Sequence, residues 1–220
     1  MLGAGALTLV ELARGNLTWA LGWFLVAAGC GIVTRYWSVK YPAPIPYLLR
    51  WALLVPRGNH SPGHLKRILE PRGGDRILEI GPGIGIHALP VALSLAPDGT
   101  LDVFDVQQEM LDDVMRRAGE AGITNITAKQ GDAQRLPYRD GTFDSAYLVG
   151  VLGEVPDGQA ALRELRRVLK PSGHLVVGEV FVDPEFVLFG SLKGRAERAS
   201  FAFESRLGGS FSYLARFRPV

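Results

Sequence analysis

The sequence predicts an α/β fold built on a mostly parallel sheet, with a hydrophobic helical segment in front of it. Two observations carry this prediction. Between residues 76 and 181, short apolar runs alternate with stretches of helical periodicity, which is the order that builds a parallel sheet. Near the N-terminus, residues 16–34 contain no charged side chain over nineteen positions. We therefore expect a hydrophobic segment and linker in residues 1–58 and an α/β domain in residues 59–220.

The uncharged segment has about the length that a helix needs to cross a bilayer core of roughly 30 Å. Arg14 precedes it, and Arg35 and Lys40 follow it. Because positive charge is denser on the C-terminal side, we expect a membrane-spanning helix that leaves the α/β domain in the cytoplasm. Two alternatives are a cleaved signal segment and a helix that covers the ligand site or joins a dimer through its small residues, Gly22, Ala27, Ala28 and Gly29.

Residues 41–58 begin as a linker stiffened by prolines. A short apolar segment follows from Tyr47 to Val55, in which Arg50 is the only charge. The pattern fits three interpretations: a segment lying in the membrane interface, a cover over a substrate pocket, or a helix packed on the domain.

The remaining elements follow in chain order. A helix is expected from Ser61 to Glu70, because Ser61 can cap it and Pro62 suits its first turn. His60 and His64 lie at its start, where we expect both to be solvated. Strands are predicted at 76–80, 101–106, 125–130, 143–149 and 174–181. Helices are predicted at 84–95 with a kink at Pro90, at 108–121 and at 157–169. The tail alternates as a hairpin over 201–206 and 211–218, and residues 184–200 form a short connection.

Three alternating glycines, Gly81, Gly83 and Gly85, separate the first strand from its helix. Glycines at such a bend let the backbone turn tightly and approach a ligand that a Cβ would push away. The dinucleotide pattern G-x-G-x-x-G does not fit, because Ile86 stands where its third glycine belongs. A P-loop does not fit either, since no lysine lies near. The bend is therefore a nucleotide-type binding turn of another kind.

Three carboxylates are predicted around this bend. Glu79 lies two residues before the first glycine, Asp105 follows the second strand, and Asp132 follows the third. Together they would repel a pyrophosphate, but they suit a ligand with ribose hydroxyls, an amino group and a cationic centre. S-adenosylmethionine is such a ligand.

Five blocks between residues 76 and 183 complete a resemblance to the class I S-adenosylmethionine-dependent methyltransferases that act on small molecules. The blocks are 79–85 (EIGPGIG), 103–111 (VFDVQQEML), 131–137 (GDAQRLP), 141–145 (GTFDS) and 165–175 (LRRVLKPSGHL). The resemblance covers about half of the chain. It implies a Rossmann-like, mostly parallel sheet of seven strands with an antiparallel last strand, which the tail hairpin would supply.

The resemblance also implies roles in binding the cofactor. Glu79 would orient the methionine end through the glycine turn, and Asp105 would accept hydrogen bonds from both ribose hydroxyls. Asp132 and Ala133 would meet the adenine edge, with Val106 against the adenine face. The alternative for Asp105 is a helix cap, and the alternative for Glu79 is a structural carboxylate that holds the loop amides.

Gly150 and Glu154 follow the fourth strand. Gly150 is expected to border the cofactor, and Glu154 is the candidate catalytic residue, at the edge of the pocket. A general base is needed only where the accepting atom carries a proton of high pKa. Many members of the family carry histidine near this position, so Glu154 is a departure from their pattern. Weaker candidates lie near the end of the fifth strand: Glu179, Asp183 and Glu185.

Composition excludes several classes of function. A net charge of +2 over 220 residues does not indicate a nucleic-acid surface. Cys30 is the single cysteine, so an intramolecular disulfide is excluded, and no cluster of histidine, cysteine or carboxylate residues suggests a metal.

These observations lead us to expect a membrane-associated methyltransferase that uses S-adenosylmethionine on a small lipophilic acceptor, such as a lipid head group, a quinone precursor or an isoprenoid-like molecule. Because residues 184–200 are too short for a large substrate-covering insertion, residues 1–70 are expected to select the substrate. One alternative is a soluble methyltransferase of a polar metabolite, capped by the N-terminal helices. Another is a non-catalytic subunit that binds S-adenosylmethionine and anchors a partner enzyme at the membrane.

Overall fold

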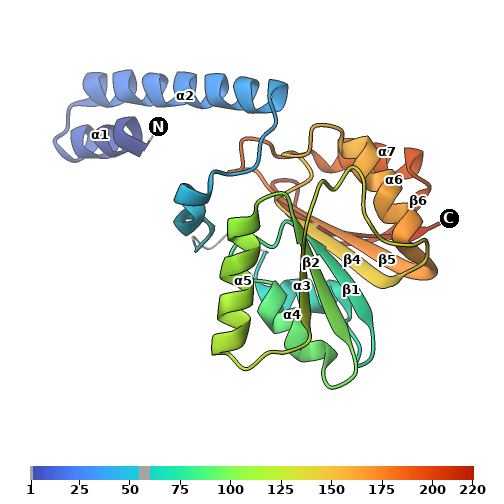
Figure 1. Ribbon diagram of the computed structural model, residues 1–220. Helices are drawn as coiled ribbons and strands as arrows, with labels where there is room; N and C mark the ends of the chain where they lie inside the picture. Colours follow the sequence, from blue (N-terminus) through green and yellow to red (C-terminus); the bar gives the residue numbers. More distant parts are fainter. Residues whose placement is uncertain (1, 55–59) are drawn as a thin grey trace. The chain divides into compact units, whose positions relative to one another are not determined.

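The computed structural model describes residues 2–54 and 60–220 of the chain (Figure 1). The chain divides into two compact units, Met1–Pro42 and Ala43–Val220. The division predicted between residues 58 and 59 falls outside the described residues. It separates a membrane-associating part from an enzyme part, and it stays a prediction.

The first unit is a pair of helices, α1 (Leu2–Ala13) and α2 (Leu17–Lys40), that pack against each other. Glu11 holds the turn between them, because its carboxylate accepts hydrogen bonds from Asn16 Nδ2 at 2.9 Å and from Arg14 Nη1 at 3.3 Å. α1 lies outside the predicted elements.

α2 contains the uncharged segment and continues beyond it to Lys40. In the described ranges it is the one helix that is long and apolar enough to cross a membrane, over Leu17–Ser38 with a mean hydropathy of 1.7. Only 6% of its apolar window is buried. The predicted long apolar helix is therefore present, with most of its apolar side chains exposed.

In the described part of the second unit, seven strands form one sheet in the order β3-β2-β1-β4-β5-β7-β6. The strands are β1 (Arg76–Ile80), β2 (Thr100–Asp105), β3 (Ile126–Gln130), β4 (Phe143–Val149), β5 (Leu169–Val180), β6 (Phe201–Gly208) and β7 (Ser212–Pro219). The first five pair in parallel, whereas β7 runs antiparallel to both of its neighbours. The predicted sheet is confirmed. Since β2 and β4 flank β1 on opposite sides, the carboxyl ends of β1 and β4 border the crevice where such sheets bind ligands.

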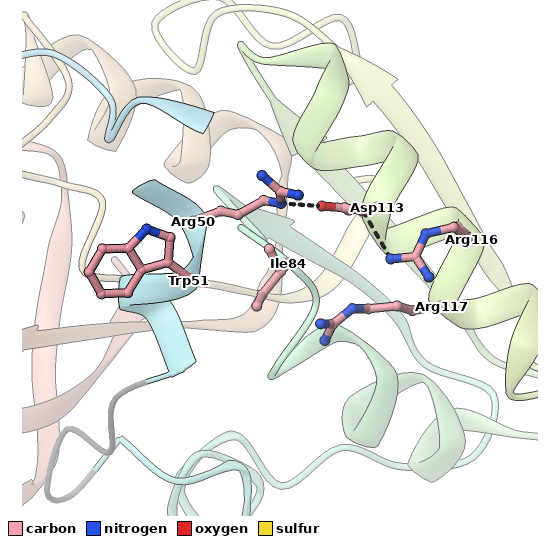
Figure 2. A pocket seen from close by; sticks show the side chains of 6 residues that line it. All are labelled: Arg50, Trp51, Ile84, Asp113, Arg116 and Arg117. Carbon is pink, nitrogen blue, oxygen red and sulfur yellow. Dashed lines mark hydrogen bonds and ion pairs between the residues drawn. The ribbon is translucent and has the colours of Figure 1, made fainter. Parts of the chain in front are cut away.

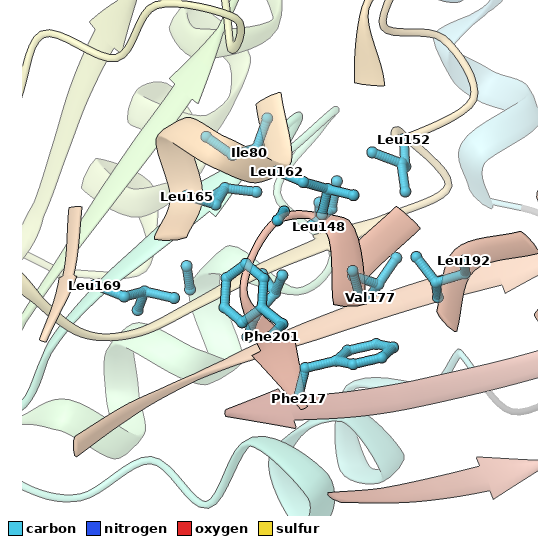
Figure 3. Packing of buried hydrophobic residues seen from close by; sticks show 14 of the residues in the cluster. Ile80, Leu148, Leu152, Leu162, Leu165, Leu169, Val177, Leu192, Phe201 and Phe217 are labelled. Carbon is cyan, nitrogen blue, oxygen red and sulfur yellow. The ribbon is translucent and has the colours of Figure 1, made fainter. Parts of the chain in front are cut away.

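Helices cover both faces of this sheet (Figure 1). One face carries α3 (Pro62–Leu69), α4 (Ala88–Leu95) and α5 (Gln108–Glu120), and the other carries α6 (Gly158–Val168) and α7 (Phe189–Arg198). Figure 3 shows the second layer, in which Leu162 and Leu165 of α6 share a buried cluster with Phe201 and Phe217 of the tail hairpin.

Alternation along β1 decides which face each of its side chains joins. Ile77 belongs to the buried cluster under α3, α4 and α5, whereas Leu78 and Ile80 belong to the cluster under α6 and α7. Glu79 therefore shares the face of Ile77, where a carboxyl group has little access to water.

Caps fix the starts of two helices where the sequence placed them. The Ser61 hydroxyl accepts the N–H of His64 at 3.3 Å at the start of α3, and the Asp157 carboxylate accepts the N–H of Ala160 at 2.9 Å at the start of α6. Such caps satisfy N–H groups that have no partner within the helix.

Three sequence predictions need correction. The helix predicted from Ile84 begins at Ala88, because Gly85 has a left-handed φ of +83° that a helix does not accommodate. Pro90 then lies in the first turn of α4, where its missing N–H has no cost, so it need not cause a kink. His60 is not solvated: it is buried, with Nε2 3.0 Å from the carbonyl oxygen of Tyr213.

The connection at 184–200 contains a helix, α7, which was not predicted. Its buried side chains are Leu192 and Ala196, which form a stripe too short to stand out in the sequence. β5 also begins at Leu169, five residues before the predicted start.

Candidate functional site

The glycine turn brings the backbone to the carboxyl end of β1. The N–H of Gly81 donates to the carbonyl oxygen of Phe104 in β2 at 2.9 Å. Gly81, Gly83 and Gly85 have φ values of +66°, +54° and +83°, a region that favours glycine. A Cβ at Gly81 would overlap the side chain of Val151, and one at Gly85 would lie 2.9 Å from Leu89 Cδ1. The turn therefore requires glycine for both conformation and space.

Glu79 is a buried carboxyl group directly under this turn. It lies opposite Tyr147 in the register of β1 and β4, and the Tyr147 hydroxyl donates to Glu79 Oε2 at 2.8 Å. Burial, with a smaller contribution from the charge of Asp105, raises the pKa of Glu79 to about 8. Glu79 therefore holds a structural hydrogen bond with Tyr147, and its carboxyl group is also electrostatically coupled to Asp105.

Asp105 ends β2 and is 9% exposed. Its Oδ1 accepts the N–H of Gln107 at 2.9 Å, and the backbone of Val106 also contributes a hydrogen bond. Burial raises the pKa of the Asp105 carboxyl, and these bonds act in the opposite direction. The carboxylate is thus held in a fixed orientation at the edge of the crevice, beside the exposed side chain of Val106.

Asp132 follows β3 and is exposed. Its carboxylate accepts three hydrogen bonds from Gln134, one from the N–H at 2.9 Å and two from the side-chain amide at 2.7 and 2.9 Å. The preceding Gly131 donates its N–H to the carbonyl oxygen of Asp105 at 2.9 Å, which joins the ends of β2 and β3. Gln134 was not singled out in the sequence, since its role depends on the folded loop.

Glu154 is half-buried in the loop after β4. Burial raises the pKa of Glu154 to about 9, and the negative charges of Asp183, Glu185 and Asp105 act in the same direction. The loop is anchored by Gly150, whose N–H donates to the carbonyl oxygen of Gly178 at 2.8 Å. Glu79, Asp105 and Glu154 therefore share one site.

Glu179 near the end of β5 is 1% exposed, and its Oε2 accepts the N–H of Val187 at 3.1 Å. Burial raises the pKa of Glu179 to about 8. The loop that follows β5 packs closely on the loop that follows β4, because a Cβ at Gly153 would overlap the backbone of Glu185. Two of the weaker acidic candidates, Asp183 and Glu185, thus lie near Glu154.

The segment before η1 (Tyr47–Leu54) crosses the same edge of the sheet. The Gln107 side-chain amide donates to the carbonyl oxygen of Ile45 at 3.0 Å, and the backbone of Ile45 forms a hydrogen bond with Glu154. Ile45 therefore connects the end of β2 to the loop after β4. Sequence reasoning could not find this connection, because Ile45 acts only through its backbone.

η1 itself is fixed to α5 by Asp113. The Tyr47 hydroxyl donates to Asp113 Oδ2 at 3.1 Å, and Arg50 Nε lies 3.2 Å from the same oxygen. Figure 2 shows Arg50 reaching toward Asp113, with Trp51 on the opposite side of η1. A cavity of about 250 Å³ lies here, and its lining includes Ile84 of the glycine turn.

These features fit a ligand of the adenosine type. The turn offers a bare backbone that side chains would block, and Asp105 offers a buried acceptor beside an exposed apolar side chain. In the described ranges, no group of three or more histidine, cysteine, aspartate or glutamate residues has the arrangement needed to hold a metal ion.

Comparison with known proteins identifies a matching family and several relatives. The family described as methyltransferase domain matches residues 78–177. The chain is 36% identical over 112 residues to a demethylmenaquinone methyltransferase of Lactobacillus johnsonii, covering 50% of this chain and 46% of the relative. It is 33% identical over 152 residues to the ubiquinone/menaquinone biosynthesis C-methyltransferase UbiE of Pseudomonas fluorescens, covering 66% of this chain and 58% of the relative. The chain thus spans about half the length of these curated relatives.

Among solved structures, the fold is similar to that of a SAM-dependent methyltransferase from Aquifex aeolicus, with a TM-score of 0.72 and 17% sequence identity. The similarity covers 80% of this chain and 98% of that chain. At this identity it shows a common fold.

Proposed function

We propose that this chain, which matches the methyltransferase domain family over residues 78–177, is an S-adenosylmethionine-dependent methyltransferase that transfers a methyl group to a small lipophilic acceptor at a membrane. The acceptor class rests on one observation, the similarity of this chain to two quinone methyltransferases. We infer a quinol-type ring with an isoprenoid-like tail. The family and the fold imply S-adenosylmethionine as the cofactor.

The proposed binding of the cofactor follows from the geometry of the carboxyl edge. S-adenosylmethionine supplies, when bound, a methyl group on a positively charged sulfur. Asp105 would accept hydrogen bonds from the ribose hydroxyls, because its carboxylate is buried and already oriented by backbone N–H groups. Glu79 would act on the methionine end through the glycine turn, and Gly150 would border the cofactor.

The adenine end would lie between β2 and β3. Val106 exposes an apolar side chain next to Asp105, as a face for the adenine ring requires. Asp132 and Ala133 follow the neighbouring strand, and Gln134 fixes the Asp132 carboxylate. We propose that this pair recognises the adenine edge.

Glu154 is the proposed general base. Its raised pKa of about 9 means that the carboxyl holds a proton at neutral pH in the absence of a cation. A positive charge nearby favours the ionised form, so a cationic ligand would lower that pKa. The ionised Glu154 would accept the proton of the acceptor's hydroxyl group as the acceptor forms its new bond to the methyl carbon. The bond between that carbon and the sulfur would break in the same step, and S-adenosylhomocysteine would leave as a neutral thioether.

Membrane association is proposed for α2. Its apolar side chains are exposed around the helix, and its charged residues lie near its C-terminal end. We propose that a bilayer covers this surface and that the positive charge at the C-terminal end of α2 keeps the enzyme part on the cytoplasmic side.

The test compares two acceptors of the same ring chemistry. The purified full chain is given S-adenosylmethionine and either demethylmenaquinol in phosphatidylcholine vesicles or a tail-less naphthoquinol in solution, and the products are identified by mass spectrometry. We expect methylation of the tailed acceptor at the higher kcat/KM. Methylation of the soluble acceptor alone, or of neither while the cofactor binds, would overturn the proposal.

A further inference from the structure

We propose that the carboxyl edge of the sheet carries a second membrane-contact surface, separate from α2, that rests on lipid beside the mouth of the site. This apolar rim consists of Leu48 and Trp51 of η1 and of Phe181, Val182 and Phe211 at the ends of β5 and β7. It would let a lipophilic acceptor pass from the bilayer to Glu154 without crossing water. The inference rests on the proposed membrane location.

The rim is apolar and open to solvent. The exposed fractions are 80% for Leu48, 57% for Trp51, 54% for Phe181, 76% for Val182 and 64% for Phe211. Scattered single apolar side chains are ordinary on a protein surface, but grouped ones mark binding surfaces. Tryptophan, as in Trp51, is also enriched at the membrane–water interface, because its amphipathic ring sits at the level of the head groups.

The phenylalanine half of the rim is held outward by the fold. The N–H of Phe181 donates to the carbonyl oxygen of Phe211 at 2.7 Å, and their ring centroids lie 5.3 Å apart. Phe181 also contacts the buried ring of Phe186, with centroids 5.8 Å apart, and Phe186 packs on Tyr213. Since the buried rings already fill the core at this point, the exposed rings stay at the surface.

The η1 half is held by its polar side chains. Tyr47 and Arg50 both bind Asp113 of α5, and the Arg50 guanidinium stacks over the Tyr47 ring at 4.1 Å. Trp51 lies on the other side of η1 from Arg50 (Figure 2). The polar residues therefore face the domain, and the apolar residues Leu48 and Trp51 remain exposed.

Both halves border the same mouth. Ile45, two residues before η1, is hydrogen-bonded to Glu154 and to Gln107. Asp183 and Glu185, which follow Val182 closely, act electrostatically on the same Glu154. The two halves of the rim thus flank the candidate catalytic carboxyl.

Lipid is the occupant that fits this rim best. Only residues 41–46 join α2 to η1, and six residues reach at most about 20 Å, so an α2 in the bilayer keeps the rim near lipid. A second copy of the chain would need a continuous surface of about 800 Å² on each partner. The rim is instead two small groups of side chains separated by a polar, acidic mouth.

Single-cysteine fluorescence in vesicles tests the inference. The full chain is labelled with bimane at native Cys30 in α2, or, in a Cys30→Ser background, at Val182→Cys or Ser172→Cys. Val182 lies just beyond the carboxyl end of β5, and Ser172 is an exposed residue near the opposite end of the same strand. Each protein is reconstituted in phosphatidylcholine vesicles that contain nitroxide-labelled lipids, with the nitroxide at the head group or on the acyl chain.

We expect the acyl-chain nitroxide to quench the label at Cys30 and the head-group nitroxide to quench the label at position 182, while the label at 172 keeps its fluorescence. Quenching at Cys30 with equal fluorescence at 182 and 172 would overturn the rim and leave the membrane helix standing. Absence of quenching at both Cys30 and position 182 would overturn the membrane location itself. Cross-linking of position 182 between two chains, without lipid quenching, would overturn the rim in favour of a dimer.

Discussion

Asp105→Asn is the substitution that isolates the proposed ribose contact. The asparagine keeps an oxygen that can accept the N–H groups of Val106 and Gln107, so the loop and the start of α5 should fold as before. It replaces the second carboxylate oxygen with an amide N–H₂ group, which cannot accept a hydrogen bond from a ribose hydroxyl, and it removes the negative charge. The change is therefore local to what the ligand would meet.

The expected loss can be worked from the burial of this residue. Asp105 is 9% exposed, so water cannot replace a lost contact easily. A hydrogen bond to a charged group contributes about 1.5–3 kcal/mol. Since about 1.4 kcal/mol is a factor of ten in affinity, losing one such bond should weaken S-adenosylmethionine binding by about 10- to 150-fold.

Isothermal titration calorimetry of the full chain with S-adenosylmethionine and with S-adenosylhomocysteine measures this loss. Asp98→Asn, at an exposed position before β2, serves as the matched control and should bind as the wild type does. An Asp105→Asn dissociation constant within about two-fold of the wild-type value would refute the assignment, because that is under about 0.5 kcal/mol.

Three further predictions concern the turn and the buried acids. Gly81→Ala should lower the free energy of unfolding, measured by urea titration, by about 1–2 kcal/mol for the left-handed backbone and more for the overlap with Val151; adding Val151→Ala should restore part of the loss, and no restoration would contradict the overlap. Burial raises the pKa of Glu79 from 4.5 to about 8, so its stabilising effect is complete below pH 4.5 and is lost as the pH rises to 8. In Glu79→Gln, the free energy of unfolding should therefore decline less steeply with pH, by about 1.4 kcal/mol per pH unit within that window; a slope equal to that of the wild type would count against a protonated Glu79. Glu154→Gln should lower kcat by roughly 10²–10⁴-fold with unchanged S-adenosylhomocysteine affinity, and should remove the rise of kcat with pH; a pH profile that survives the substitution would exclude Glu154 as the base.

Local features of the sequence predicted most of the fold. The alternation of strands and helices and the glycine turn depend on residues close in the chain, and the structure places them where they were expected. The start of α4 was placed too early because periodicity extends through residues 84–87, whereas the left-handed backbone at Gly85 stops the helix there. α7 was missed because only two of its side chains, Leu192 and Ala196, are buried.

From the sequence, only those residues of the candidate site that lie at or just after the ends of strands could be placed together. The placement of Glu79, Asp105 and Glu154 near one edge follows from their positions at or after strand ends, since the carboxyl ends of parallel strands meet there, whereas their roles stay predictions. The bond from Tyr147 to Glu79 and the crossing of Ile45 over the site depend on contacts between residues more than sixty positions apart. Burial of His60 has the same origin, because its partner Tyr213 lies at the other end of the chain. No sequence pattern announces such contacts.

Methyl-label transfer tests the central claim most directly. The full chain is incubated with methyl-labelled S-adenosylmethionine and, in parallel, with the lipid extract and the aqueous metabolite pool of the cells that produce it. We predict label in the quinone-containing fraction of the lipid extract and none in the aqueous pool. Label confined to the aqueous pool, or absent from both while the protein binds S-adenosylmethionine, would contradict the account.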